Sequence, residues 1–437
     1  MQAISTLINA RWIVPVEPEG LILEYHALAI DGGCILAILP QAEAATRYQA
    51  ETCLMLDRQV LMPGLINAHT HASMTLLRGL ADDLPLLNWL QDHIWPAEAR
   101  WVDPAFVRAG TRLAVAELLR GGITCFNDMY FFPEATAAVA CETGIRACVG
   151  LIALDFPTAY ARSLDEYLSK GLALHEASRS EPLLHTALAP HAPYTVSTPA
   201  LERIGRLATD LNLPVHIHVH ETAAEVADFQ ARHGCRPLQR LEEIGLLSPR
   251  LLAVHMTQLE PVEIERLVQT GVHVIHCPES NLKLASGFCP VAQLDAAGAN
   301  VAIGTDGAAS NNDLDLFGEL RTAALLGKGV AGDARVLPAA RILRMATLNG
   351  AKALGLAHET GSLEPGKSAD VIAVDLGELE TEPLYHPLSQ LVYAVSRRQV
   401  SNVWVAGQRV LAERHLTTLD LDETVREARN WRDRIAA

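Results

Sequence analysis

In Pro63-Gly64-Leu65-Ile66-Asn67-Ala68-His69-Thr70-His71 a short apolar run ends in two histidines, and this pattern is the starting point for predicting the fold. Residues i and i+2 of a strand face the same side, with Cα atoms about 6.5–7 Å apart, so both imidazoles can reach one metal ion. Two histidines this close also arise by chance. The pair therefore gains meaning only if the rest of the chain supplies more strands that end in reactive side chains.

Seven further apolar runs follow the first one, at positions 123–127, 147–154, 183–189, 215–219, 251–255, 272–276 and 301–305. Amphipathic stretches of helical periodicity separate most of them, at positions 103–120, 198–211 and 261–270. Eight strand-like runs that alternate with helices predict an α/β fold, namely a (β/α)8 TIM-like barrel. In such a barrel the chemistry lies at the C-terminal ends of the strands.

Both ends of the chain have a different, β-rich pattern. The runs 27–30 and 34–39 flank the turn Asp31-Gly32-Gly33, and strand-like runs recur at 369–374 and 403–410. We therefore expect a small β-sandwich domain formed from both termini. The predicted domains are residues 1–61 with 366–420 for this β domain, 62–365 for the metal-dependent catalytic barrel, and 421–437 for a C-terminal surface helix.

Composition excludes several classes of protein. The 437 residues include 35 Lys and Arg against 51 Asp and Glu, which gives a net charge of −16 with neutral histidine. This balance repels phosphate backbones, and no run of Lys and Arg offsets it, so we expect no nucleic acid partner. The charge-free stretch 183–201 is broken by three prolines and is no membrane span.

Location is predicted from the N-terminus and the cysteines. The first ten residues carry no Lys or Arg, unlike the start of a secretory signal. None of the eight cysteines has CxxC spacing and most lie in apolar segments, a pattern typical of reduced, buried thiols. We expect a cytoplasmic protein.

The fifth strand-like run carries three histidines. His216, His218 and His220 share one face, while Ile217 and Val219 share the other and suit packing against helices. Alternation alone does not decide which histidine binds a metal. We select His218, because His220 falls past the strand end and His216 lies deeper in the barrel. His216 and His220 are expected to be hydrogen-bonded core or loop histidines.

Two more reactive side chains end strands of the predicted barrel. The sixth run ends in His255 after four apolar residues, and the eighth is followed by Asp306. A lone histidine there is usually structural, and a lone aspartate often caps the next helix. Four such residues on strands one, five, six and eight of one barrel are the stronger observation, and they predict a metal site.

Taken together, these motifs resemble the amidohydrolase superfamily, and more narrowly its 5-methylthioadenosine/S-adenosylhomocysteine deaminase branch. The resemblance rests on the stretch 63–71, on His218 with Glu221, on His255 and on Gly304-Thr305-Asp306-Gly307. Segments 89–98, 189–194 and 276–284 add to it, so that it spans nearly the whole chain.

The resemblance implies one divalent metal ion per subunit, Zn²⁺ or Fe²⁺, held by His69, His71, His218 and Asp306. A nitrogen and oxygen donor set without thiolates suits either ion. The metal would acidify water and supply a hydroxide nucleophile at neutral pH.

It also implies the catalytic roles. Glu221 would act as the general acid that protonates N1 of an adenine ring, and Asp306 would carry the proton of the attacking water to the departing ammonia. His255 would steady the tetrahedral intermediate by a hydrogen bond.

Substrate contacts follow from the same resemblance. Glu98 would accept hydrogen bonds from the ribose hydroxyls, His191 would contact the purine and Trp89 would form an apolar wall. Ser280 and Asn281 follow the seventh strand and are expected to shape the floor of the pocket.

The expected function is hydrolytic deamination of an adenine nucleoside to its inosine analogue and ammonia. Some relatives that accept S-adenosylhomocysteine place an arginine near the end of strand three, whereas positions 148–157 contain no cation. A zwitterionic tail would lack its charge partner there, so we favour 5'-methylthioadenosine, with S-adenosylhomocysteine and adenosine as further candidates. Arg146 and Arg162 lie nearby in the sequence.

Two alternatives remain. A deaminase of guanine, an oxidised purine or cytosine, or a triazine-type hydrolase, would share the metal ligands but would have no ribose for Glu98 to bind. A non-catalytic barrel scaffold would not need Glu221 and His255. The expected partners are a small-molecule nucleoside and further copies of the chain, since relatives are commonly homodimers or tetramers, with no nucleic acid and no membrane.

Overall fold

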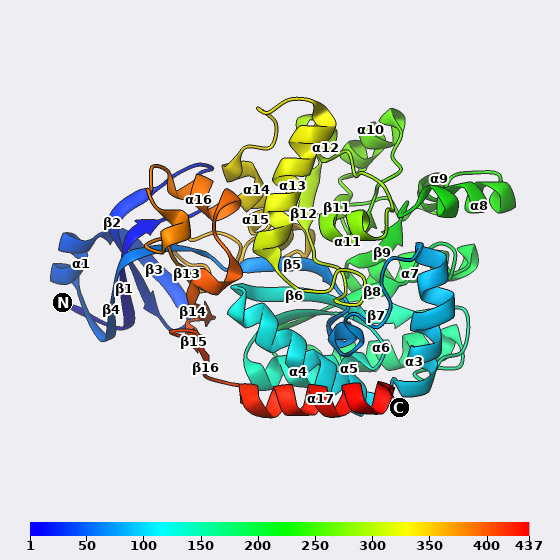
Figure 1. The fold of residues 1–437 in the computed structure, drawn as a ribbon, viewed down its shortest axis with the longest axis horizontal. Coiled ribbons are helices and arrows are strands. Elements are labelled where there is room, and N and C mark those ends of the chain that lie inside the picture. Colours follow the sequence, from blue (N-terminus) through cyan, green and yellow to red (C-terminus); the bar gives the residue numbers. More distant parts are fainter. Residues whose placement is uncertain (437) are drawn as a thin grey trace.

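A ring of eight parallel strands forms the centre of the molecule (Figure 1). The structure is a computed structural model and describes residues 1–436. The strands of this ring follow one another in sequence order: β5 (Leu65–Thr70), β6 (Ile123–Tyr130), β7 (Arg146–Ala153), β8 (Leu184–Pro190), β9 (Val215–Val219), β10 (Leu251–His255), β11 (His273–His276) and β12 (Asn300–Ile303). Each overlaps one of the eight predicted runs, so the predicted TIM-like barrel is confirmed.

The ring closes through side-chain and backbone hydrogen bonds where its first and last strands meet. The Asn67 amide nitrogen donates to Thr305 Oγ1 at 2.8 Å, and its carbonyl oxygen accepts from the Thr305 backbone N–H at 3.0 Å. The Asp306 N–H donates to the carbonyl of His69 at 3.0 Å. This seam brings the histidines after β5 next to the aspartate after β12.

Helices cover the outside of the barrel (Figure 1). They are α4 (Pro104–Arg120), α5 (Pro133–Thr143), α6 (Leu164–Ser178), α7 (Thr198–Leu211), α8 (Ala223–His233), α9 (Pro237–Glu243), α10 (Pro261–Thr270), α11 (Pro278–Lys283), α12 (Val291–Ala297), α13 (Leu316–Ala331), α14 (Ala339–Met345) and α15 (Leu348–Ala353). The three predicted helices correspond to α4, α7 and α10. Helix α4 begins where the Asp103 carboxylate accepts from the Phe106 N–H at 2.7 Å, which satisfies a donor that the first helical turn leaves free.

A long insertion lies between β5 and α4. It contains the 3-10 turn η1 (Ala72–Leu77), α2 (Leu86–Trp89), the π-helical turn η2 (Leu90–Ile94) and α3 (Trp95–Trp101). Trp89 and Ile94 pack with Met74 and Leu77 of η1 and with Phe106 of α4 in one apolar cluster. The insertion thereby rests on the barrel and carries Trp89 and Glu98.

The two termini build a second sheet beside the barrel (Figure 1). Its strands, in spatial order, are β16 (His415–Leu416), β15 (Gln408–Ala412), β14 (Val400–Val405), β13 (Val371–Asp375), β4 (Tyr48–Pro63), β1 (Gln2–Ile13), β2 (Leu23–Asp31) and β3 (Cys34–Pro40). Short helical elements accompany it: α1 (Gln41–Arg47), η3 (Leu379–Thr381), α16 (Pro387–Tyr393) and η4 (Arg397–Gln399).

This sheet curls around one core. Ile8, Ile30 and Ile35 from its first strands share a buried cluster with Val371 and Trp404 from its last strands. Such packing of one part of a sheet on another is the expected architecture of the β domain formed from both termini. The domain boundaries given above stay a prediction.

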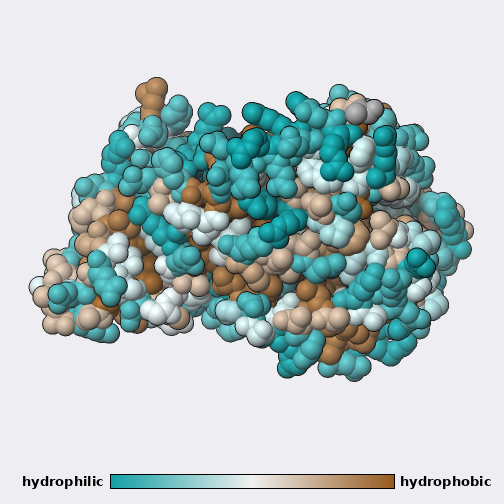
Figure 2. All heavy atoms as spheres, turned by 90° about the horizontal axis from the view of Figure 1, so that it is seen from below, coloured by the Kyte–Doolittle hydropathy of each residue, from teal (hydrophilic) through white to brown (hydrophobic). Residues whose placement is uncertain are grey.

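Helix α17 (Leu421–Ala436) lies on the surface, along α4 (Figure 1). Trp431 anchors it, since its ring meets the edge of Phe106 at 5.3 Å and only 5% of the residue is exposed. Figure 2 shows the molecule from this side, where hydrophilic residues dominate and apolar ones form scattered patches. No helix within residues 1–436 has the length and apolar character needed to span a bilayer.

Candidate active site

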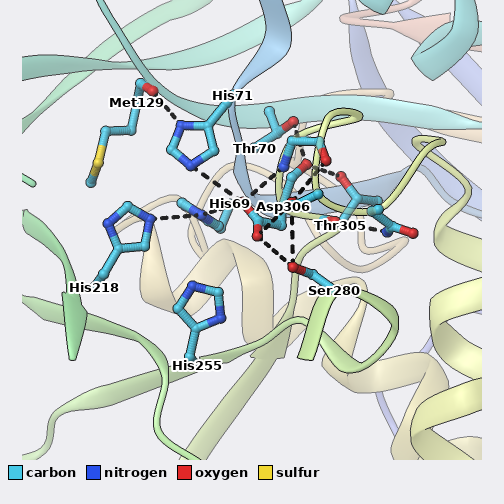
Figure 3. A network of polar contacts seen from close by, with 12 residues as sticks. His69, Thr70, His71, Met129, His218, His255, Ser280, Thr305 and Asp306 are labelled. Atoms are coloured by element: carbon cyan, nitrogen blue, oxygen red, sulfur yellow. Dashed lines mark hydrogen bonds and ion pairs between the residues drawn. The ribbon is translucent and has the colours of Figure 1, made fainter. Parts of the chain in front are cut away.

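Four predicted ligand residues meet at the C-terminal mouth of the barrel (Figure 3). Oδ1 of Asp306 lies 3.3 Å from His69 Nε2 and 3.2 Å from His71 Nε2. His218 Nε2 lies 3.2 Å from His69 Nε2. Donors bonded tetrahedrally to zinc at about 2.1 Å lie about 3.4 Å from one another, so the separations among His69, His71 and Asp306 fit one metal ion. His218 adjoins this group through His69 and belongs with His69 and His255 to a second group of close donors.

The remaining polar atoms of the three histidines have partners. His71 Nδ1–H donates to the Met129 carbonyl at 2.6 Å, and His218 Nδ1–H donates to the His191 carbonyl at 2.7 Å. His69 Nδ1 lies 2.8 Å from Nε2 of His216. A carbonyl partner fixes the tautomer of a ligand histidine, so His71 and His218 each have the Nε2 lone pair available for a metal.

His216 and His220 have other surroundings than His218. His216 is fully buried and contacts His69, so it supports a candidate ligand from behind. His220 Nε2 instead accepts a hydrogen bond from the Leu238 N–H at 3.2 Å. Both are hydrogen-bonded interior histidines, as the strand pattern led us to expect.

Two serine hydroxyls orient the Asp306 carboxylate. Its Oδ2 accepts from Ser280 Oγ at 2.6 Å and from Ser310 Oγ at 2.9 Å, which leaves Oδ1 facing the histidines (Figure 3). A Cβ at Gly304 would lie 2.7 Å from the His69 nitrogen, so only glycine permits this close approach. The Gly304-Thr305-Asp306-Gly307 motif is therefore a packing requirement of the seam.

Glu221 and His255 flank the ligand cluster. His255 Nδ1–H donates to Asn281 Oδ1 at 2.9 Å, and its Nε2 lies 3.8 Å from a carboxylate oxygen of Glu221. Burial, with the negative charge of Asp306 nearby, raises the pKa of Glu221 to about 8. Glu221 is thus able to hold a proton at neutral pH.

A cavity of about 500 Å³ opens above this cluster. Eight of the nine residues predicted to bind the metal, act in catalysis or contact the substrate line its wall: His71, Trp89, Glu98, His191, His218, Glu221, His255 and Asp306. The ninth, His69, lies beneath the wall and is fully buried. The volume suits a small molecule of nucleoside size.

The predicted substrate contacts line this cavity. Glu98 of α3 accepts a hydrogen bond from the Tyr130 hydroxyl at 2.7 Å, and burial raises the pKa of Glu98 to about 7. Burial lowers the pKa of His191 to about 3, so His191 is neutral. Trp89 is 5% exposed and forms part of the apolar wall.

No Lys or Arg lines this cavity among the described residues. Arg146 begins β7 at the opposite end of the barrel, where its Nε donates to Asp370 Oδ2 at 2.9 Å. Arg162 is exposed and does not line the cavity. The wall near the end of β7 consists of Ile152, Leu154, Phe156 and Pro157.

The sequence interpretation gave some supporting residues another role and missed others. Ser280 and Asn281 do not form the floor of the cavity and instead orient Asp306 and His255. Tyr130 orients Glu98 from β6, which no local motif indicates. One supporting residue had a signal in the sequence: the strand alternation places His216 on the same face as His218, and His216 contacts His69.

Comparisons with known proteins agree with this geometry. A model of the amidohydrolase family matches residues 60–410. A relative from Teredinibacter turnerae, named 5-methylthioadenosine/S-adenosylhomocysteine deaminase, is 51% identical over 98% of this chain and 97% of its own. A relative of the same name from Moorella thermoacetica is 44% identical over 95% of this chain and 96% of its own.

Solved structures show the same fold. A crystal structure of an adenosine deaminase from Xanthomonas campestris with bound zinc has a TM-score of 0.99 at 55% identity, covering 100% of this chain and 99% of that chain. Atrazine chlorohydrolase TrzN from Arthrobacter aurescens, complexed with zinc, has a TM-score of 0.91 at 24% identity, covering 98% of this chain and 100% of that chain. At this identity the likeness shows the fold alone.

These findings confirm the predicted hydrolase class and the predicted resemblance. The chain belongs to the amidohydrolase family, in the group of relatives that carry the name 5-methylthioadenosine/S-adenosylhomocysteine deaminase.

Proposed function

We propose that this chain is a metal-dependent hydrolytic deaminase of adenine nucleosides, with 5'-methylthioadenosine as its preferred substrate and the inosine analogue and ammonia as products. The observation that carries the proposal is the position of Glu221. A carboxyl group that holds its proton at neutral pH lies beside a cluster of metal donors, in the wall of a cavity of nucleoside size.

His69, His71, His218 and Asp306 would hold the divalent metal, Zn²⁺ in the first place and Fe²⁺ as the other ion that suits these donors. The zinc in the Xanthomonas campestris structure supports this choice. When bound, the metal supplies the Lewis acidity that makes water a nucleophile at neutral pH.

Glu221 acts as the general acid. Attack of water at the amine-bearing carbon places charge on the purine ring, and a proton delivered to N1 neutralises it. The raised pKa of Glu221 keeps that proton available at neutral pH.

Asp306 transfers the proton of the attacking water, and His255 stabilises the attacking oxygen. Asp306 Oδ1 faces the point where the histidine Nε2 atoms converge, so it takes the proton of the attacking water and passes it to the departing ammonia. His255 Nε2 faces the same space, while Asn281 fixes its ring, so it hydrogen-bonds the attacking oxygen and stabilises the tetrahedral intermediate.

The nucleoside is held by three residues from different elements. Glu98 accepts from the vicinal ribose hydroxyls, and Tyr130 orients its carboxylate. Neutral His191 contacts the purine edge. Trp89 supplies an apolar wall for the nucleoside.

The wall near the end of β7 supports the thioether preference. Ile152, Leu154, Phe156 and Pro157 offer an apolar slot for a methylthio group. A zwitterionic amino-acid tail would find no guanidinium or ammonium among the residues that line the cavity. We therefore rank 5'-methylthioadenosine above adenosine and S-adenosylhomocysteine.

A deaminase of guanine, an oxidised purine or cytosine, or a triazine-type hydrolase, is the rival that shares the metal ligands. Glu98 distinguishes it, since a free base has no hydroxyls for this carboxylate. A non-catalytic scaffold has no use for the buried acid Glu221.

The test is ammonia release from a panel of substrates by the zinc-loaded protein. The panel contains 5'-methylthioadenosine, S-adenosylhomocysteine, adenosine, guanine, cytosine and a chlorotriazine, the last assayed for chloride. The highest kcat/KM is expected for 5'-methylthioadenosine. A higher value for a free base or for the triazine would overturn the proposal, and a higher value for S-adenosylhomocysteine would overturn the thioether preference.

The cytoplasmic location and the homo-oligomeric state, a dimer or a tetramer, stay predictions. Size-exclusion chromatography with light scattering measures the latter.

A further inference from the structure

Four arginines that are distant in the sequence meet at the junction of the barrel and the terminal sheet. Arg120 ends α4, Arg397 and Arg398 belong to η4, and Arg414 lies in the turn between β15 and β16. They line a second cavity of about 490 Å³, together with Glu117 and the apolar side chains of Leu113, Ala116 and Leu421. No run of cations in the sequence indicates this cluster, and it contrasts with the net charge of −16.

Within residues 1–436, three of these guanidinium groups have no carboxylate partner. Arg398 has neither a hydrogen bond nor an ion pair, and it is exposed. Arg120 donates only to the Arg414 carbonyl, at 2.9 Å. Arg414 donates only to backbone carbonyls, those of Arg120, Arg397 and Val400 at 2.7–3.0 Å.

The fourth arginine is already neutralised. Arg397 Nη1 lies 2.6 Å from Glu117 Oε1, and further carboxylates, those of Asp313 and Asp315, lie 3.9 and 3.8 Å from its guanidinium. Glu117 is shared with Arg78, so it does not offset the other three cations. The cavity therefore has an excess of positive charge.

Positive charges gathered around one cavity repel one another. Burial, together with the cations of Arg120, Arg398 and Arg397, lowers the pKa of Arg414 to about 10. A bound anion would relieve this repulsion, and guanidinium groups bind phosphate oxygens in bidentate fashion. Leu113, Ala116 and Leu421 would contact an apolar part of the same ligand.

We propose that this cavity is a binding site for a small anion with adjacent phosphate groups, separate from the active site. Arg120, Arg398 and Arg414 bind the phosphates, and Arg397 with Glu117 forms the structural base of the site. Two adjacent phosphates match three guanidinium groups without a carboxylate partner better than a single monoanion does.

The test is isothermal titration of the full-length, metal-loaded protein with inorganic pyrophosphate, ADP and chloride at equal ionic strength. Saturable binding of one pyrophosphate per chain is expected, with no saturation by chloride. Because the proposed active site also admits an adenine nucleoside, ADP binding counts for this site only where Arg398→Glu weakens it. ADP binding of that kind that is tighter than pyrophosphate binding would identify a nucleotide as the ligand, and equal binding a free polyphosphate; both support the site. The absence of saturable binding by pyrophosphate and ADP overturns the proposal.

Variants locate the binding. Arg398→Glu removes a side chain with no partner in the described chain, so the fold is expected to persist, and pyrophosphate affinity is expected to fall about tenfold or more. Arg179→Glu makes the same charge change on the exposed end of α6 and serves as the control. Equal affinities of the two variants would assign the binding to overall charge and overturn the site.

Discussion

Glu221 is the residue on which the proposed chemistry depends most. Glu221→Gln keeps the shape of the side chain but removes the acidic proton, so kcat is expected to fall about 10²- to 10⁴-fold. The metal content is expected to stay unchanged, because Glu221 is not among the four converging ligands. Steady-state kinetics with metal analysis measure both. Full activity of this variant would contradict the assigned role.

The pH profile tests the same group. With a pKa of about 8, Glu221 is protonated below that pH and loses its proton above it. Since the acid form is the active one, kcat/KM is expected to fall as the pH rises through about 8. The residual rate of Glu221→Gln lacks this alkaline limb. An identical limb in both proteins would assign it to another group.

His216 tests how a side chain behind the site affects the metal. His216→Phe removes the partner of His69 Nδ1, so metal affinity is expected to fall about 10- to 100-fold. Excess zinc then restores activity. His220→Gln, two residues along, alters a histidine that contacts the Leu238 backbone, and is expected to leave metal affinity unchanged. Competition with a chromophoric chelator measures both, and equal affinities of the two variants would contradict the role of His216.

At the scale of elements, the insertion between β5 and α4 holds Trp89 and Glu98 over the site. Lys283, which ends α11, stabilises the position of this insertion. The Lys283 ammonium lies 2.6 Å from Asp82 of the insertion and also contacts Asn312. A partly exposed ion pair contributes about 0.2–1 kcal/mol, so Lys283→Ala is expected to raise KM by up to about fivefold with kcat retained.

The control for this variant is Arg232→Ala, which breaks an exposed ion pair with Asp228 on α8. Its KM is expected to equal that of the unchanged protein. A loss of kcat rather than a rise of KM in Lys283→Ala would show that the contact acts on the chemistry instead of on the insertion.

The barrel elements could be predicted from the sequence because each strand contains a short apolar run, and four of them, β5, β9, β10 and β12, lead into a reactive residue. Helix α7 was found for a similar reason, since Leu201, Ile204 and Ala208 recur at helical spacing on its buried face. The insertion had no such pattern. Its π-helical turn, η2, follows from packing against η1 and α4, which a local window of sequence does not contain.

The predicted ligands came together because parallel strands align their C-terminal ends. Residues that act from behind, such as Ser280 and Tyr130, depend on how neighbouring strands and loops pack. The arginine cluster likewise forms only when α4 meets the terminal sheet.

At the scale of the whole molecule, Arg146 joins the barrel to the terminal sheet. Its side chain is fully buried and donates to Asp370 at 2.9 Å and to Ser368 at 3.1 Å, with Glu359 as a further partner. Arg146→Met leaves Asp370 buried without its cation, so the free energy of unfolding is expected to fall by about 3–5 kcal/mol. Urea denaturation measures the loss.

The double variant Arg146→Met with Asp370→Asn removes both charges. It is expected to be less destabilised than the sum of the two single variants, because the unpaired charge is gone. Additive losses would show that the pair does not couple the two parts of the molecule.

The position of the metal in a crystal of the zinc-loaded protein, measured by anomalous scattering at the zinc edge, tests the central claim most directly. One peak is expected, bonded at about 2.1 Å to the Nε2 atoms of His69, His71 and His218 and to Asp306 Oδ1. The nitrogens of His69, His218 and His255 form the competing group. A peak bonded to His255 in place of His71 and Asp306, or no peak at the barrel mouth, would contradict the proposed centre.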